Sequence, residues 1–184
     1  MKHLSIVLVL FLGFSSAQAQ IKIEPEKGFT PQVGFLVSML NDMSSRVERT
    51  VKDLKVIEVD FLLDENANSI GTLILHLAAT EKLYQVLTFE NREFNAEEQK
   101  EWGTRMSMGD AARKEFKGKK VSYYLDIYKE VRVKTLEYLK EKDDEWLAKV
   151  DKKLGMNYHW GWYHVMEHQS SHLGQILLIK KRIP

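Results

Sequence analysis

Hydrophobic residues along most of this chain recur at intervals of three or four, the spacing that places side chains on one face of an α-helix. Four such stretches occur, from residue 31 to about residue 54 and over residues 70–89, 120–142 and 157–181. The alternating pattern of a half-buried strand is not seen in these stretches. The pattern therefore predicts an all-α protein built as a four-helix bundle.

The predicted helix starts carry residues that suit helix N-termini. Thr30 followed by Pro31 is typical of an N-cap and the first helical position. Residues 66–69 (Asn-Ala-Asn-Ser) supply several good N-caps for the second helix. No proline occurs between Pro31 and Pro184, so no proline interrupts a helix in that range.

The connection between the second and third predicted helices is unusually long. Asn95 with Glu98 matches a capping box, which predicts a short helix that ends near Trp102. Gly103 and Gly109 bracket a part rich in turn residues. Connections of this length are uncommon unless they cross the bundle or line a site, and we expect one or both here.

Residues 1–19 have the organisation of a secretory signal peptide. Lys2 precedes an apolar run over residues 4–14, which is followed by the small-residue motif Ala17-Gln18-Ala19. A retained membrane anchor is the less favoured alternative, because spanning a bilayer takes roughly 20 apolar residues. We expect cleavage after this motif. The product would be one exported domain over residues 20–184, periplasmic or secreted, without stable membrane insertion.

Composition excludes several classes of function. The chain has no cysteine, so neither a disulfide nor a thiolate ligand or nucleophile is available. Its 27 basic and 26 acidic residues become 26 of each when Lys2 leaves with the signal peptide. Without a basic excess, binding to nucleic acid is not expected. The sequence leaves open whether the protein is a homodimer.

Three histidines are the candidate metal ligands. His168 and His172 lie four residues apart in the last predicted helix and therefore share a face. His76 falls on the inner side of the second helix, toward its edge. Two imidazoles on one face can bind one transition-metal ion, and a third from a facing helix leaves positions open for substrate. The alternative is ordinary histidines with ordinary hydrogen bonds, although a buried unpaired imidazole pair is costly.

Two further polar residues are candidates for the rim of this site. His164 lies one turn before His168 but falls further round the helix, where it could contact a substrate. Gln175 lies close to His172 and is a candidate for orienting a ligand, or it is an ordinary polar residue.

Aromatic residues gather at the start of the last predicted helix. Trp162 is the candidate pocket residue among them, together with Tyr158, Trp160 and Tyr163. They either wall a substrate pocket or pack at the end of the bundle, with their polar atoms reaching water.

No carboxylate can be assigned as a general base, and the catalytic residues stay unassigned. Glu81 and Glu167 both project away from the predicted inner faces of their helices. Gln85 also falls outside the apolar arc of the second helix.

Two segments resemble the DinB-like superfamily, which includes YfiT-type metalloenzymes. They are residues 68–81, which contain His76, and residues 168–176, which contain the histidine pair. In that family Arg-Gly-Gln usually follows the second histidine of the pair, whereas Leu173 replaces the arginine here. The resemblance implies a four-helix bundle of up-down-down-up order, with a long crossover between the second and third helices.

The same resemblance implies a mononuclear site for one divalent transition metal, zinc or nickel, held by the residues that match His76, His168 and His172. Imidazole also suits copper and iron, so the ligands alone do not choose the metal. Some relatives transfer low-molecular-weight thiols. We therefore expect a metal-dependent enzyme that activates water or a thiol toward a small-molecule substrate, as an S-transferase or a hydrolase. The alternative is a non-catalytic exported bundle that binds a metal or a small ligand.

Overall fold

The computed structural model describes residues 22–184, so the signal-peptide prediction for residues 1–19 lies outside it. Within the described range almost all regular structure is helical. The four long helices are α1 (Pro31–Val51), α3 (Ile70–Phe89), α6 (Val121–Lys140) and α8 (Tyr158–Lys180). The shorter elements are α2 (Val56–Val59), α4 (Ala96–Ser107), α5 (Gly109–Phe116), α7 (Asp144–Ala148) and the antiparallel two-residue strands β1 (Val150–Asp151) and β2 (Met156–Asn157).

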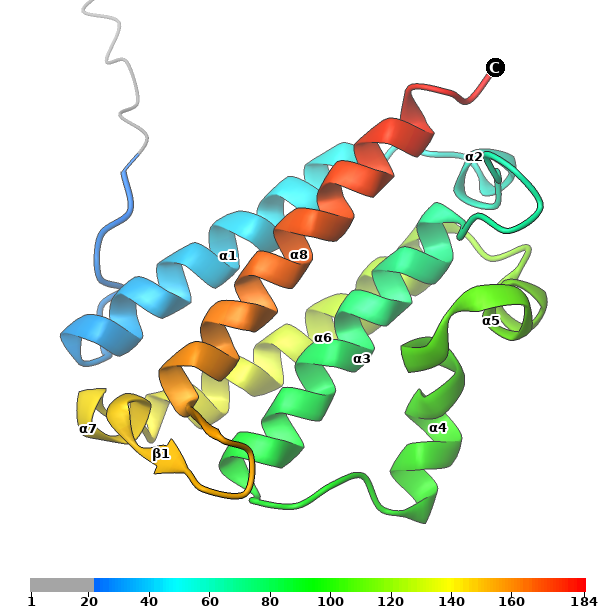
Figure 1. Cartoon of the computed structure of the whole chain (residues 1–184). Helices are drawn as coiled ribbons and strands as arrows, with labels where there is room; N and C mark the ends of the chain where they lie inside the picture. Colours follow the sequence, from blue (N-terminus) through cyan, green and yellow to red (C-terminus); the bar gives the residue numbers. More distant parts are fainter. Residues whose placement is uncertain (1–21) are drawn as a thin grey trace, which may run out of the picture.

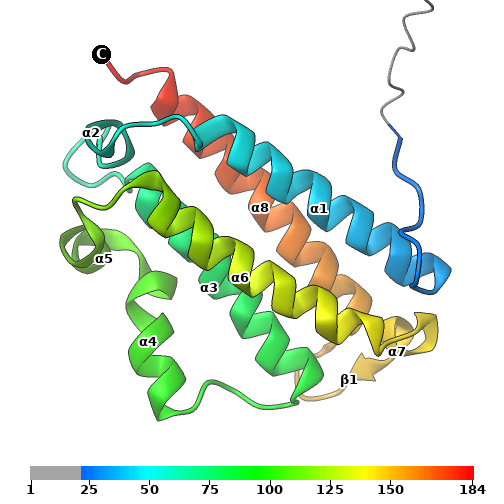
Figure 2. The same ribbon diagram turned by 180° about the vertical axis from the view of Figure 1, so that it is seen from behind.

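The long helices form the expected bundle of up-down-down-up order. In Figure 1, α1 and α8 run in one direction, and α3 and α6 run in the opposite direction. Helix α3 packs against both α6 and α8, and α1 completes the bundle against α8 and α6. The view from behind shows α4 and α5 along the outer side of α3, inside the crossover that joins α3 to α6 (Figure 2). None of the described helices is long and apolar enough to cross a membrane.

Capping side chains place the helix starts where the sequence predicts them. The Ser69 hydroxyl accepts a hydrogen bond from the backbone N–H of Thr72 at the start of α3. The Asn157 side chain accepts one from the N–H of Trp160 at the start of α8. Each bond satisfies a backbone donor that the first helical turn leaves free.

The crossover is more helical than the sequence predicts. The capping box of Asn95 and Glu98 is present, but α4 continues past Trp102 to residue 107. Gly103 therefore lies inside the helix and not in a turn. Trp102 is almost fully buried and Met106 packs on the same hydrophobic cluster. This packing outweighs the penalty of about 1 kcal/mol for a helical glycine.

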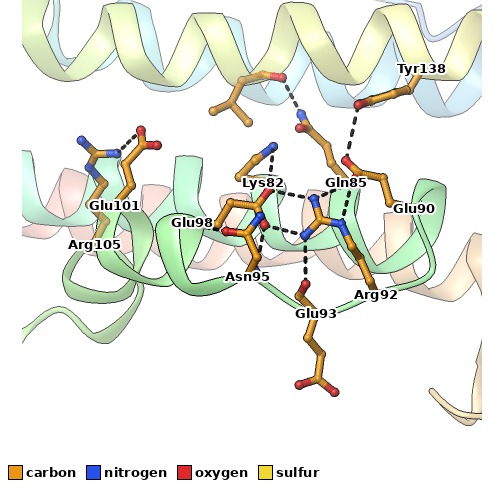
Figure 3. Close-up of polar contacts among 11 residues, drawn as sticks. Lys82, Gln85, Glu90, Arg92, Glu93, Asn95, Glu98, Glu101, Arg105 and Tyr138 are labelled. Atoms are coloured by element: carbon orange, nitrogen blue, oxygen red, sulfur yellow. Dashed lines mark hydrogen bonds and ion pairs between the residues drawn. The ribbon is translucent and has the colours of Figure 1, made fainter.

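A polar network fastens α4 to the end of α3. Figure 3 shows Arg92 between Glu90 and Glu98, with its guanidinium NH2 group donating to Glu98 Oε1 at 2.9 Å. Lys82 on α3 lies 3.8 Å from the same carboxylate oxygen. The crossover is thus held against the side of α3 that the hydrophobic pattern leaves to solvent.

Because α4 covers its outer side, α3 is buried almost all round over its first half. The prediction that Glu81 and Gln85 project away from the core is wrong: their exposed fractions are 0 % and 1 %. Both side chains face α6 inside the bundle, where Arg132 bonds to Glu81 and Thr135 bonds to both. A hydrophobic pattern identifies apolar side chains, so it does not reveal a polar layer within the core.

Candidate metal centre

Helices α3 and α8 bring together the three histidines singled out by the sequence. His168 Nε2 lies 3.2 Å from His76 Nε2 and 3.1 Å from His172 Nε2. Each of the three residues offers one ligand atom, and these atoms all lie within 4.8 Å of one another. The convergence arises because the i, i+4 pair on α8 faces the antiparallel neighbour α3 at the level of His76.

Hydrogen bonds at Nδ1 set the ring orientation of two of these histidines. His76 Nδ1 donates to the backbone carbonyl of Met106 at 2.8 Å. His172 Nδ1 donates to Gln175 Oε1, also at 2.8 Å. With its hydrogen on Nδ1, each ring presents the lone pair of Nε2 toward the other histidines, as metal-binding imidazoles do.

The acceptor for His76 is the end of a helix. Met106 lies in the last turn of α4, where backbone carbonyls have no partner within the helix. The negative end of the helix dipole also favours an N–H donor at this position. Sequence reasoning missed this contact, because it involves a backbone atom of the crossover. The only signal for it was the length of that connection.

The donor set fits a divalent transition metal. Two ligands about 2.0–2.1 Å from a tetrahedral zinc ion stand about 3.4 Å apart, close to the two Nε2 separations. Without a cation, a single N–H on His168 could satisfy only one of the two lone pairs that face it. The Nδ1 atom of His168 is buried and has no hydrogen-bond partner among the described residues. One cation would satisfy all three Nε2 atoms at once.

The surroundings favour the neutral form of His76 and His168. Burial lowers the pKa of His76, and the neighbouring His172 lowers it further. Burial, together with His172, His76 and His164, lowers the pKa of His168 to about 3. Only the neutral ring can bind a metal, so these shifts leave both rings ready for a cation at neutral pH.

His164 lies at the rim of the cluster, as expected. Its ring centroid is 5.6 Å from that of His168 and 5.3 Å from that of Trp160, on which it stacks. Its Nδ1 atom lies 3.2 Å from Glu167 Oε2, and about a third of its side chain is exposed. His164 is thus close to His168 and partly open to solvent.

Trp162 does not lie at this site. The side chain is fully buried and packs in a hydrophobic cluster with residues of α1 and α7. Its indole N–H donates to the hydroxyl of Thr88 at 3.2 Å. With no exposed surface it cannot wall a pocket, so the packing alternative describes this residue. Burial of this large apolar indole in the core is more favourable than its exposure at the end of the bundle.

Comparison with known proteins bears on this site. The model of a family described as mycothiol S-transferase matches residues 35–183, a range that contains all three clustered histidines. That family lies within the DinB/YfiT-like superfamily. The search of curated proteins returned no significant match to the chain.

Proposed function

Since the chain belongs to the mycothiol S-transferase family of the DinB-like superfamily, we propose that it is a metal-dependent S-transferase. It joins the sulfur of a low-molecular-weight thiol, such as mycothiol, to an electrophilic small molecule. The observation that carries this proposal is the convergence of His76, His168 and His172 through their Nε2 atoms. Zinc and nickel both suit three imidazoles.

Three neutral imidazoles would hold a divalent ion without cancelling its charge and would leave positions for substrate. A dication bound there lowers the pKa of a thiol that contacts it, which raises the share of reactive thiolate at neutral pH. The Nδ1 bonds of His76 and His172 leave Nε2 of each ring free to hold the ion. His76 is buried and the other two histidines are partly buried, which strengthens these electrostatic effects relative to bulk water.

The transfer moves one proton and forms one bond to sulfur. The thiol gives up its proton and its sulfur bonds to the electrophilic carbon. The bond from that carbon to the leaving group breaks, and its electron pair goes to the leaving group. His164 is placed to accept the proton at Nε2, because its Nδ1 atom is engaged with Glu167. Its partial exposure lets the proton continue to solvent.

A transfer assay on protein purified without a histidine tag tests the proposal. The protein is loaded with zinc or with nickel and supplied with mycothiol or other small thiols and an electrophile whose conjugation changes its absorbance. We expect turnover and about one metal ion per chain. His168→Ala should lose the metal and lower kcat/KM by about a hundredfold or more.

His159→Ala is the matched control, because this exposed histidine lies on the first turn of the same helix. It should retain both metal and activity. A folded protein that binds metal yet turns over no thiol would contradict the transferase and favour a non-catalytic binding protein. Export is a prediction from residues 1–19. The molecular mass of the chain recovered from the periplasm or the medium tests it, because cleavage would remove these residues.

A further inference from the structure

A buried ion pair lies at the centre of the bundle and joins α3, the helix that carries His76, to α6. Glu81 on α3 and Arg132 on α6 have exposed fractions of 0 % and 5 %. Arg132 Nε donates to Glu81 Oε1 at 2.8 Å, and the guanidinium NH2 group donates to Oε2 at 2.7 Å. Burial disfavours the charge of Arg132, but the adjacent carboxylate outweighs it and raises the pKa of the guanidinium.

Gln169 joins α8 to this pair. Its side-chain amide donates to Glu81 Oε2 at 3.0 Å, and its carbonyl oxygen accepts from the Arg132 NH2 group at 3.3 Å. The side chain is 1 % exposed. Three helices therefore meet in one set of directional bonds, and Gln169 contributes the only such bonds that α8 makes to the pair among the described residues.

This polar layer separates two hydrophobic clusters. On α8, Leu173 belongs to one cluster and Val165 to the other, with Gln169 between them. On α6, Val131 and Leu139 flank the layer in the same way. A buried ion pair contributes little net stability compared with apolar packing, but directional bonds can fix the register of neighbouring helices.

The layer is well placed to fix the histidines. Gln169 follows His168 directly, so the two side chains leave α8 about 100° apart and any rotation of the helix moves both. A metal site tolerates only about 0.5 Å or 10–20° of misplacement before its geometry suffers. The directional bonds of Gln169 add to apolar packing a fixed register of α8 against α3 and α6.

We propose that Gln169 is a positioning residue, which locks α8 to Glu81 and Arg132 so that His168 and His172 meet His76 at metal-binding distance. This inference rests on the proposed function, because it assumes that the three histidines bind a metal. It extends that function by assigning a role to a core residue that touches neither metal nor substrate.

Gln169→Leu is the direct test, since Glu81 and Arg132 remain paired with each other in this variant. Zinc affinity is measured by competition with a chromophoric chelator, and cobalt(II) absorption reports the geometry of the ligands. We expect zinc binding to weaken by about 10- to 100-fold, as for loss of other groups that orient metal ligands, and the cobalt spectrum to shift. Gln169→Met, which keeps the length of the side chain, should give the same result if the leucine variant fails to fold.

Gln85→Leu is the matched control. Gln85 is an equally buried glutamine, but its amide donates to the Val131 carbonyl and to Thr135, both on α6, and no hydrogen bond among the described residues joins it to α8. Figure 3 shows its side chain directed toward α6. We expect it to lower the melting temperature comparably while zinc affinity stays within about threefold and the cobalt spectrum is unchanged.

The results separate this inference from the proposed function. If the wild-type protein binds zinc and Gln169→Leu leaves both affinity and spectrum unaltered, the positioning role is wrong and the transferase stands. Equal effects of Gln85→Leu and Gln169→Leu would also overturn it, because the role would then be general stabilisation. If the wild-type protein binds neither zinc nor cobalt, the proposed function fails and the inference fails with it.

Discussion

Single hydrogen bonds decide whether a histidine can serve as a ligand. His76 uses a part-buried backbone carbonyl, whereas His172 uses the exposed amide of Gln175. Water replaces a part-buried acceptor less readily than an exposed one. The two bonds thus perform the same task with different sensitivity to mutation.

We predict that Gln175→Ala weakens zinc binding by about tenfold, the lower end of the range for groups that orient metal ligands. Water would replace part of the lost bond to His172 Nδ1. Chelator competition measures the affinity. Ser171→Ala is the control, because its hydroxyl bonds to Glu167 on the exposed side of the same helix and should leave zinc binding unchanged. An unaltered affinity in Gln175→Ala would contradict the orienting role.

The N-terminus of α1 is capped by a residue from elsewhere in the chain. Thr30 occupies the N-cap of α1 as predicted, but its side chain does not accept a bond from the helix. Asp144 from α7 accepts bonds instead from the backbone N–H groups of Gln32 and Val33, at 3.0 and 3.2 Å, and from the Thr30 hydroxyl. The first turn of α1 thus receives its acceptor from a residue distant in sequence.

Removal of this acceptor should have a pH-dependent effect on stability. The bond from Thr30 contributes most to lowering the pKa of Asp144, and the two backbone donors add to it. The stabilisation is therefore present above the ordinary carboxyl pKa of 3.8 and is lost as pH falls through the lower folded value. We expect Asp144→Ala to lower the melting temperature by about 2–4 °C at pH 7 and by little near pH 2.

Thermal denaturation followed by circular dichroism across this pH range measures the difference. Asp126→Ala, at an exposed position of α6, is the comparison variant and should change the melting temperature little at either pH. If Asp144→Ala lowers the melting temperature by the same amount at pH 2 and at pH 7, ionisation of Asp144 does not contribute to stability as proposed.

The core of the whole molecule is built from apolar residues of all four long helices. Two hydrophobic clusters fill the bundle on either side of the polar layer. With an apolar core of this extent, we expect the fold not to depend on a bound ion, unlike that of small zinc domains that unfold without metal. A metal should still stabilise the bundle, because it ties α3 to α8 only in the folded state.

We predict that the metal-free protein is folded and that zinc at about a thousand times its dissociation constant raises the melting temperature by roughly 10 °C. Scanning calorimetry with and without a chelator measures this shift. His76→Ala should melt at the same temperature in both conditions. If zinc does not change the melting temperature of the wild-type protein, α3 and α8 do not share a metal site.

Features that depend on neighbours along the chain could be predicted from the sequence. The bounds of α3, the caps at Ser69 and Asn157 and the shared face of His168 and His172 all follow from helical periodicity and from residues a few positions apart. The order of the bundle followed from the family resemblance and from the length of the crossover.

Only the tertiary structure decided which polar groups are buried and which atoms meet. Glu81 becomes a core residue because Arg132 and Gln169 approach it from two other helices, and Met106 reaches His76 because α4 extends further than its glycine suggested. Arg132 and Gln169 are far from Glu81 in sequence, as Met106 is from His76. No local sequence pattern could therefore reveal these contacts. Local periodicity fixed the direction of each side chain from its own helix, whereas the packing of the helices fixed what it touches.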